Sequence, residues 1–306
     1  MVGREVGNTG LIGYDRQMDR HSFRALIAAV VLAITAVVVG RYFAGHPAVR
    51  HQLAQTSLAT LALIVILYAA TIATLALINR ATLRLCNIHP DRQEVMLLTA
   101  YTAVINFFGP LQSGPAVRAV YLKKKYQLDL KKYALATIVY YGFFALFSGL
   151  FLLSGWLRWL LVPLTAAGLI VAWQVLRHTG LRQRLASLQL QHWYSLALAT
   201  FLQVSLLVAL YYVELHSVFP SVSLGQAITY TGAANFALFV SVTPGAIGFR
   251  ESFLVFSQHL HHLSSTTIVS ANIIDRGMYV LVLLCLTVLI FGTHASQRIK
   301  AVTTKS

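Results

Sequence analysis

The chain has 306 residues, of which 57% are apolar and only 11% are Asp, Glu, Lys or Arg. Soluble globular domains carry about 25% charged residues, so this composition excludes a water-soluble fold and predicts a polytopic membrane protein. The net charge of +15 does not indicate nucleic-acid binding, because the basic residues lie between apolar runs and not on one polar face.

Six apolar runs are long enough to cross about 30 Å of hydrocarbon as helices. They cover residues 25–43, 53–79, 133–157, 159–176, 193–213 and 265–292. Two further apolar stretches, 95–117 and 222–250, contain Pro and Gly residues that interrupt helices. Residues 95–108 would form a helix of about 21 Å, which is too short to cross. We therefore expect an all-α protein with a single membrane domain, residues 1–306, about six full spans and two re-entrant broken-helix hairpins.

The positions of the basic residues predict the orientation in the membrane. If the stretch 95–117 turns back instead of crossing, 19 of the 24 Lys and Arg residues fall on one side. If it crosses, the densest basic cluster, residues 118–132, faces outward. We therefore expect this stretch to enter from the cytoplasm, with both termini cytoplasmic and the protein in the cell membrane.

The two interrupted stretches carry the same pattern, 129 residues apart up to the proline. The first copy has Tyr101-Thr102, Asn106-Phe107, Pro115 and Arg118, and the second has Tyr230-Thr231, Asn235-Phe236, Pro244 and Arg250. Three spans separate the copies, so they enter the membrane from opposite faces. This arrangement predicts an inverted repeat, about 95–132 and about 222–262, as in transporters that bind substrates at the repeat interface. The alternative is a pair of proline-kinked helices that only pack.

The breaks predict an anion-binding cavity, because irregular backbone at membrane depth must lie beside protein or water. A half-helix beginning after Pro244-Gly245 would direct free N–H groups into the cavity, and these attract anions. Arg250 lies in its first two turns, and Arg118 has the corresponding place in the first copy. Arginine donates two parallel hydrogen bonds to phosphate. The alternatives are an interfacial charge for Arg118 and a structural pair with Glu251 for Arg250.

Asp275 and Arg276 lie near the middle of the last apolar run, where ionisable residues are costly and therefore candidates for function. Neighbouring helix positions point about 100° apart, so their partners can lie on other helices, such as Arg250 or Glu251. The alternative is a buried structural ion pair. The predicted substrate-binding residues are Asn106, Arg118, Asn235, Pro244, Gly245, Gly248, Arg250, Glu251, Asp275 and Arg276.

The sequence does not indicate an enzyme. It has no Gly-rich phosphate loop, no metal-ligand cluster and no Ser/His/Asp or Cys/His arrangement. The spacing of His259, His261 and His262 does not place all three on one helix face, so we expect solvated interfacial histidines and no metal site. No cofactor is expected.

Two segments resemble motifs of the lysylphosphatidylglycerol synthase transmembrane-region family, a flippase-like family. Residues 244–251, Pro-Gly-Ala-Ile-Gly-Phe-Arg-Glu, are similar to its Pro-Gly-Gly-x-Gly-x-x-Glu signature. Residues 113–122 are similar to its first motif, in which a Gly precedes an Arg and a hydrophobic run. Asp275-Arg276 stands where the family usually has an Arg. The resemblance covers about 20 to 295, and it implies a stand-alone member without the aminoacyl-transferase domain. Residues 138–142 lack the charge that the family often carries there.

The resemblance implies a flippase-like transporter that moves the headgroup of an anionic phospholipid or a polyprenyl-phosphate-linked sugar. Two other functions stay open: a small-solute or ion transporter on the same inverted repeat, and a non-transporting membrane partner of a glycosyltransferase. The expected partners are membrane lipids and not nucleic acid, and a homo-oligomer is a further alternative.

Overall fold

The structure is a computed structural model that describes residues 54–108, 113–154, 192–240 and 249–303, together with a few single residues between 37 and 51. The chain divides into two compact units, residues 48–286 and residues 1–47 with 287–306. Within the described ranges every regular element is a helix, so the all-α prediction is confirmed there. The expected span 159–176 lies outside the described residues, as does nearly all of the expected span 25–43.

Four of the described helices are long and apolar enough to cross a membrane. They are α3 (Leu58–Leu85), α6 (Leu130–Leu153), α9 (Trp193–Val218) and the part Ser265–Ile290 of α13 (Ser265–Thr303). They correspond to four of the six predicted spans. α9 continues past residue 213, where the apolar run ends, because the Glu that follows does not interrupt a helix.

The ends of these helices follow local capping rules. The Ser57 hydroxyl accepts a hydrogen bond from the Thr60 N–H at 3.2 Å and begins α3. The Asp129 carboxylate accepts one from the Lys131 N–H at 2.9 Å and begins α6. Between them, Gln127 ends α5 in the left-handed region with φ 53°. These caps fix where each long helix starts.

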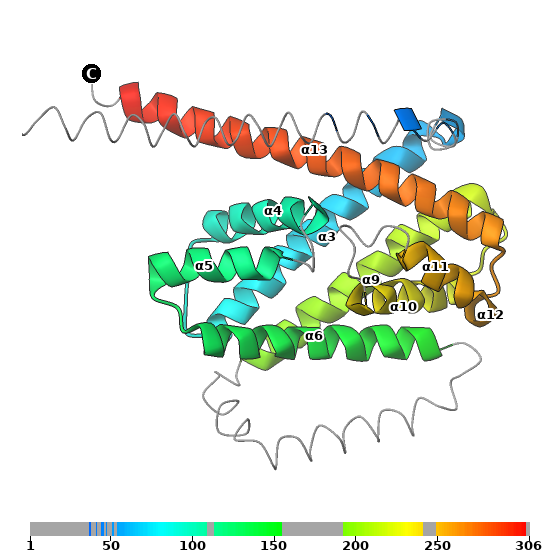
Figure 1. The fold of residues 1–306 in the computed structure, drawn as a ribbon, viewed down its shortest axis with the longest axis horizontal. Coiled ribbons are helices and arrows are strands. Elements are labelled where there is room, and N and C mark those ends of the chain that lie inside the picture. The colour runs from blue at the N-terminus through cyan, green and yellow to red at the C-terminus, as the bar shows by residue number, and fades with distance from the viewer. Residues whose placement is uncertain are drawn as a thin grey trace, which may run out of the picture. The chain divides into compact units, whose positions relative to one another are not determined.

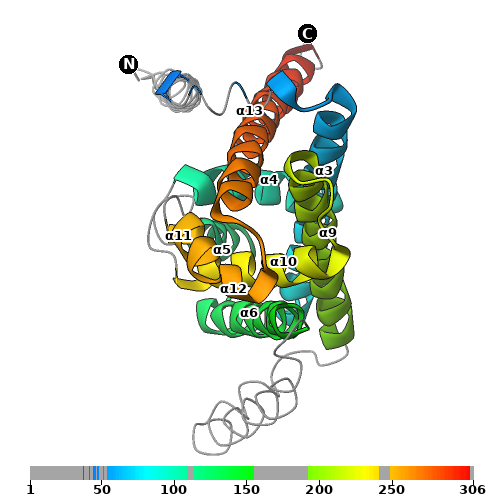
Figure 2. The ribbon, with the colours of Figure 1, turned by 90° about the vertical axis from the view of Figure 1, so that its right-hand side faces the viewer.

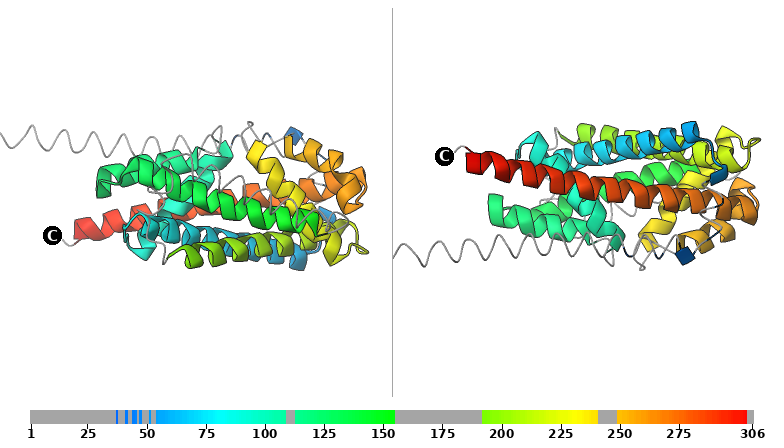
Figure 3. Two further views of the ribbon diagram at one scale, coloured as in Figure 1. Left: turned by 90° about the horizontal axis from the view of Figure 1, so that it is seen from below. Right: turned by 90° about the horizontal axis from the view of Figure 1, so that it is seen from above.

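Both interrupted stretches form short helices on either side of the predicted breaks. α4 (Arg92–Phe108) precedes α5 (Gly114–Tyr126), and α10 (Leu224–Val240) precedes α11 (Phe249–Phe256) and α12 (Gln258–His261). α4 and α10 have 17 residues each, which is about 26 Å of helix. Within the unit 48–286, the α4–α5 pair lies at one end and the α10–α12 group at the other (Figures 1 and 3).

The long helices form the frame between these two groups. α3 and α9 lie side by side (Figure 2), and α10 packs on α6. The second contact depends on Gly232, because a Cβ there would lie 2.3 Å from the backbone nitrogen of Leu152. One buried core joins α3, α9, α10, α11 and α13, and a second joins α4, α5 and α6 to α3 and α9.

A polar cluster fastens α5 to α4 at their exposed side. The Glu94 carboxylate accepts hydrogen bonds from Lys125 at 2.7 Å, Tyr126 at 2.6 Å and Tyr121 at 2.8 Å. Partial burial opposes ionisation of Glu94, but these three hydrogen bonds outweigh it and lower the pKa of the carboxyl. The cluster keeps the first hairpin closed at the end opposite its break.

Candidate functional site

A cavity of about 300 Å³ lies among the helices of the unit 48–286. Its wall contains residues of α3, α4, α5, α6, α9, α10, α11 and α13. Half of the predicted site residues line it: Asn106, Arg118, Arg250, Asp275 and Arg276. The volume is at the lower end of the range for small-molecule sites. The fold therefore brings side chains of both interrupted stretches and of the last apolar helix to one space.

Arg118 projects from the first turns of α5. Pro115 occupies the start of this helix, where its missing N–H costs nothing. Arg118 is 7% exposed and lines the cavity. Among the described residues no side chain pairs with it, and its Nε is buried without a hydrogen-bond partner. A buried arginine without a counter-ion is very unfavourable, so this end of the cavity favours a ligand with negative charge.

Arg250, on α11, is paired within the fold. Its Nη1 donates to Asp275 Oδ2 of α13 at 2.5 Å, and its guanidinium lies 5.0 Å from the centre of the Tyr211 ring. The Tyr68 hydroxyl donates to the other oxygen of Asp275. The Nε and Nη2 atoms of Arg250 are buried without partners among the described residues. Arg250 therefore keeps two donors for a ligand, although one carboxylate already balances its charge.

Arg276 pairs with Glu251, the neighbour of Arg250. Its Nη2 donates to Glu251 Oε1 at 3.1 Å, and its Nε donates to the same oxygen at 3.2 Å. Both ion pairs thus connect α11 to α13, with Arg250 reaching Asp275 and Arg276 reaching Glu251. Among the described residues, the ion pairs of these four side chains run from one helix to the other. Glu251 is not among the residues that line the cavity.

The two asparagines of the repeated pattern have different surroundings. Asn106 lines the cavity, and its Oδ1 accepts a hydrogen bond from the Gly114 N–H at 2.6 Å across the break. Asn235 is fully buried and donates to the Ser148 hydroxyl of α6 at 3.1 Å. It is not among the cavity-lining residues. Pro244, Gly245 and Gly248 lie outside the described residues.

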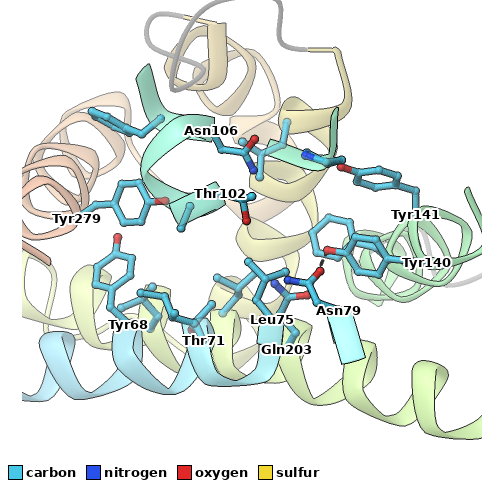
Figure 4. A pocket seen from close by; sticks show the side chains of 18 of the residues that line it. Tyr68, Thr71, Leu75, Asn79, Thr102, Asn106, Tyr140, Tyr141, Gln203 and Tyr279 are labelled. Atoms are coloured by element: carbon cyan, nitrogen blue, oxygen red, sulfur yellow. Dashed lines mark hydrogen bonds between the residues drawn. The ribbon is translucent and has the colours of Figure 1, made fainter. Parts of the chain in front are cut away.

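A wall of polar and aromatic side chains completes the cavity. Figure 4 shows Tyr68 and Tyr279 on one side, with Tyr140, Tyr141 and Gln203 on the other. The Tyr140 hydroxyl donates to Gln203 Oε1 at 3.3 Å. Tyr140 and Tyr141 lie within electrostatic reach of Arg118. In the sequence, these tyrosines belong to the segment 138–142, which lacks the charged residue that the family often has there. In the structure, they line the same cavity as the unpaired Arg118.

Glu214 is a third carboxylate that sequence reasoning missed. It lies on α9, is 1% exposed, and its Oε1 has no partner among the described residues. The predicted site residues include three arginines but only two carboxylates, Glu251 and Asp275, and Glu214 makes the numbers equal. The available signal was the lone acidic residue directly after the run 193–213, one position beyond the predicted span.

No three His, Cys, Asp or Glu side chains gather around the histidine cluster or elsewhere in the described part of the chain. The expectation of solvated histidines is wrong for His261, which is buried. It shares a hydrogen bond of 3.1 Å with the Leu254 carbonyl and packs edge-on against Tyr230. Burial lowers the pKa of this imidazole to about 4. His259 and His262 are exposed.

Comparison with known families assigns the chain to a family. The model of the family described as the lysylphosphatidylglycerol synthase TM region matches residues 25–287. The match includes both interrupted stretches and the cavity, so the chain belongs to this family. No curated protein matches the sequence.

Proposed function

We propose that this member of the lysylphosphatidylglycerol synthase TM region family moves an anionic lipid headgroup across the membrane through its cavity. The headgroup belongs to a phospholipid or a polyprenyl-phosphate-linked sugar, and its tails stay in the bilayer. The observation that supports this most strongly is Arg118, a buried cavity-lining arginine without a counter-ion among the described residues. Its guanidinium suits a phosphate because it can donate two parallel hydrogen bonds.

In this proposal the other site residues have separate roles. Arg250 offers its two unpartnered N–H groups to the headgroup while Asp275 holds its position. The pair between Arg276 and Glu251 holds α11 on α13. Asn106 shapes the first break, and Asn235 anchors α10 to α6. Pro244, Gly245 and Gly248, which lie outside the described residues, stay predicted substrate-binding residues of the second interrupted stretch. The protein has no catalytic step in this scheme.

The proposed membrane arrangement has six full spans, with both termini in the cytoplasm of the cell membrane. The two hairpins enter from opposite faces as an inverted repeat. Their location at opposite ends of the unit 48–286 supports this arrangement (Figure 3). So does the length of α4 and α10, which is short for a full span.

A proteoliposome assay tests the proposed function. Vesicles containing the purified protein carry a trace of fluorescent phosphatidylglycerol or, in parallel, fluorescent phosphatidylcholine, and dithionite bleaches the outer leaflet. We expect the protein to make the inner-leaflet phosphatidylglycerol accessible faster than the phosphatidylcholine. Equal rates for both lipids, or rates equal to those of protein-free vesicles, would contradict the proposal. Uptake of radioactive inorganic phosphate without lipid movement would instead support a small-solute transporter.

A further inference from the structure

Glu214 occupies an unusual place next to the ion pairs of the cavity. It lies about one turn beyond Leu210 and Tyr211, which line the cavity from α9. The side chain is almost completely buried, and its Oε1 has no hydrogen-bond partner among the described residues. A buried carboxylate needs a partner for each oxygen or must bind a proton. The first condition is not met within the described part of the chain.

Charged and titratable groups of five helices lie within electrostatic reach of Glu214. They are Tyr68 of α3, Tyr211 of α9, Tyr230 of α10, Arg250 of α11, and Asp275 and Arg276 of α13. The arginines in this set already have carboxylate partners, since Arg250 binds Asp275 and Arg276 binds Glu251. Asp275 in turn accepts hydrogen bonds on both oxygens, from Arg250 and from Tyr68. Glu214 is therefore the acid of this group that has no arginine partner in these two ion pairs.

The charge balance connects Glu214 to the unpaired arginine. With Glu214 ionised, the three carboxylates Glu214, Glu251 and Asp275 balance the three arginines, and this set of six residues in and beside the cavity is neutral without a ligand. With Glu214 protonated, one positive charge is in excess, and Arg118 is the arginine without a carboxylate. A bound monoanion then restores neutrality. Uncompensated charge at membrane depth is costly, so the two neutral states are favoured. These two states differ by one bound anion and one bound proton.

We infer that Glu214 is a proton-binding site linked to the anion site, so that each anionic headgroup binds together with one proton. The inference rests on the proposed function. Linkage is reciprocal, so acidification must tighten anion binding, and anion binding must draw a proton from solution. A pH gradient would then drive headgroup movement in the direction in which protons flow.

Calorimetric titration of the detergent-solubilised full chain tests this inference. The probe is short-chain phosphatidylglycerol, whose phosphodiester stays ionised from mildly acidic to mildly alkaline pH. Titrations in two buffers with different ionisation enthalpies give the number of protons taken up per anion. We expect uptake approaching one proton, and an affinity that falls by up to about tenfold for each pH unit on the alkaline side. Binding without proton uptake at any pH in this range would overturn the inference, and this measurement needs no variant.

The substitution Glu214→Gln identifies the group. It keeps the shape of the side chain and makes it permanently neutral, so we expect anion binding that is as tight as that of the wild type at acidic pH and independent of pH. Glu94→Gln, on the exposed side of the first hairpin, is the matched control and should keep the proton uptake. Proton uptake that persists in Glu214→Gln would overturn the assignment. Failure of the wild type to bind the probe at all would instead overturn the proposed function.

Discussion

Each of the two hairpins places one arginine in the wall of the cavity, but only one of the two arginines has a carboxylate partner among the described residues. Arg250 of α11 is buried against Asp275, which balances its charge, whereas Arg118 of α5 is buried with no carboxylate partner among the described residues. The sequence pattern treats the two arginines as equivalent. The structure separates them, because the partner of Arg250 comes from α13 and no comparable acid reaches Arg118 in the described part of the chain. The second hairpin is thus fixed to α13 by ion pairs, and the first one keeps its charge for a ligand.

The largest effect on folding is expected from breaking the pair in the second hairpin. Arg250→Ala leaves Asp275 buried with only the Tyr68 hydroxyl, and loss of one partner of a buried ion pair costs about 3–5 kcal/mol. Thermal unfolding in detergent should show a clear decrease in melting temperature. Adding Asp275→Asn to Arg250→Ala should recover part of the loss, because the unpaired charge is removed. Equal stability of the single and double variants would contradict a structural role for this pair.

Much of this comparison was visible in the sequence. The Pro and Gly breaks predicted where α4 ends and α5 begins, because proline at a helix start is a local signal. The ionisable residues of the last apolar run predicted ion pairs with α11, because charge in an apolar run needs a partner. Which arginine took which acid was not predictable, since it depends on how α11 packs on α13.

The missed parts of the site depend on distant packing. Tyr68 binds Asp275 across 207 positions, and Tyr140 meets Gln203 across 63. The hydrophobic periodicity of a single segment cannot predict contacts between residues so far apart in the sequence. Glu214 was missed because hydropathy ended the span one residue before it, while the backbone of α9 continues to Val218.

The close approaches in the two hairpins provide a second, smaller test. Gly232→Ala would place a Cβ 2.3 Å from the Leu152 nitrogen, and Gly114→Ala would place one 2.5 Å from Asn106 Oδ1 and 2.8 Å from the Thr102 carbonyl oxygen. Forcing an extra methyl into such contacts costs typically about 1–3 kcal/mol. We expect Gly232→Ala to lower the melting temperature more, because its nearest atoms belong to the backbone of α6 and Asn106 can shift.

A matched control for the glycine variants lies in α6. A Cβ at Gly142 meets nothing within 4 Å. Gly142→Ala should therefore leave the melting temperature unchanged or raise it, because the higher helix propensity of alanine adds up to about 1 kcal/mol to the free energy of unfolding. If all three variants unfold at the same temperature, the close approaches at Gly114 and Gly232 do not determine how the hairpins pack.

The smallest effect is expected at the exposed side of the first hairpin. The pKa of Glu94 is lowered in the folded state, so its hydrogen bonds stabilise the fold above the ordinary pKa of glutamate, and this stability is lost as the pH falls through the lowered value. Glu94→Gln should remove this acid-dependent step at a cost of about 0.5 kcal/mol at neutral pH. Urea unfolding at neutral and acidic pH measures both. An unchanged acid dependence in Glu94→Gln would assign the step to another carboxyl.

The central claim is that Arg118 is held for a ligand and not for the fold, and one paired measurement on Arg118→Ala tests it most directly. Melting temperature and dithionite-detected phosphatidylglycerol movement are recorded on the same preparation, with Lys124→Ala on the exposed face of α5 as a control with the same change in charge. We predict that Arg118→Ala melts no lower than the wild type, because it removes an unpaired buried charge, while lipid movement falls to the level of protein-free vesicles. Arg118→Lys should keep part of the movement, because it retains the charge but loses the paired hydrogen bonds. Wild-type lipid movement by Arg118→Ala, or a loss of stability as large as that of Arg250→Ala, would contradict the claim.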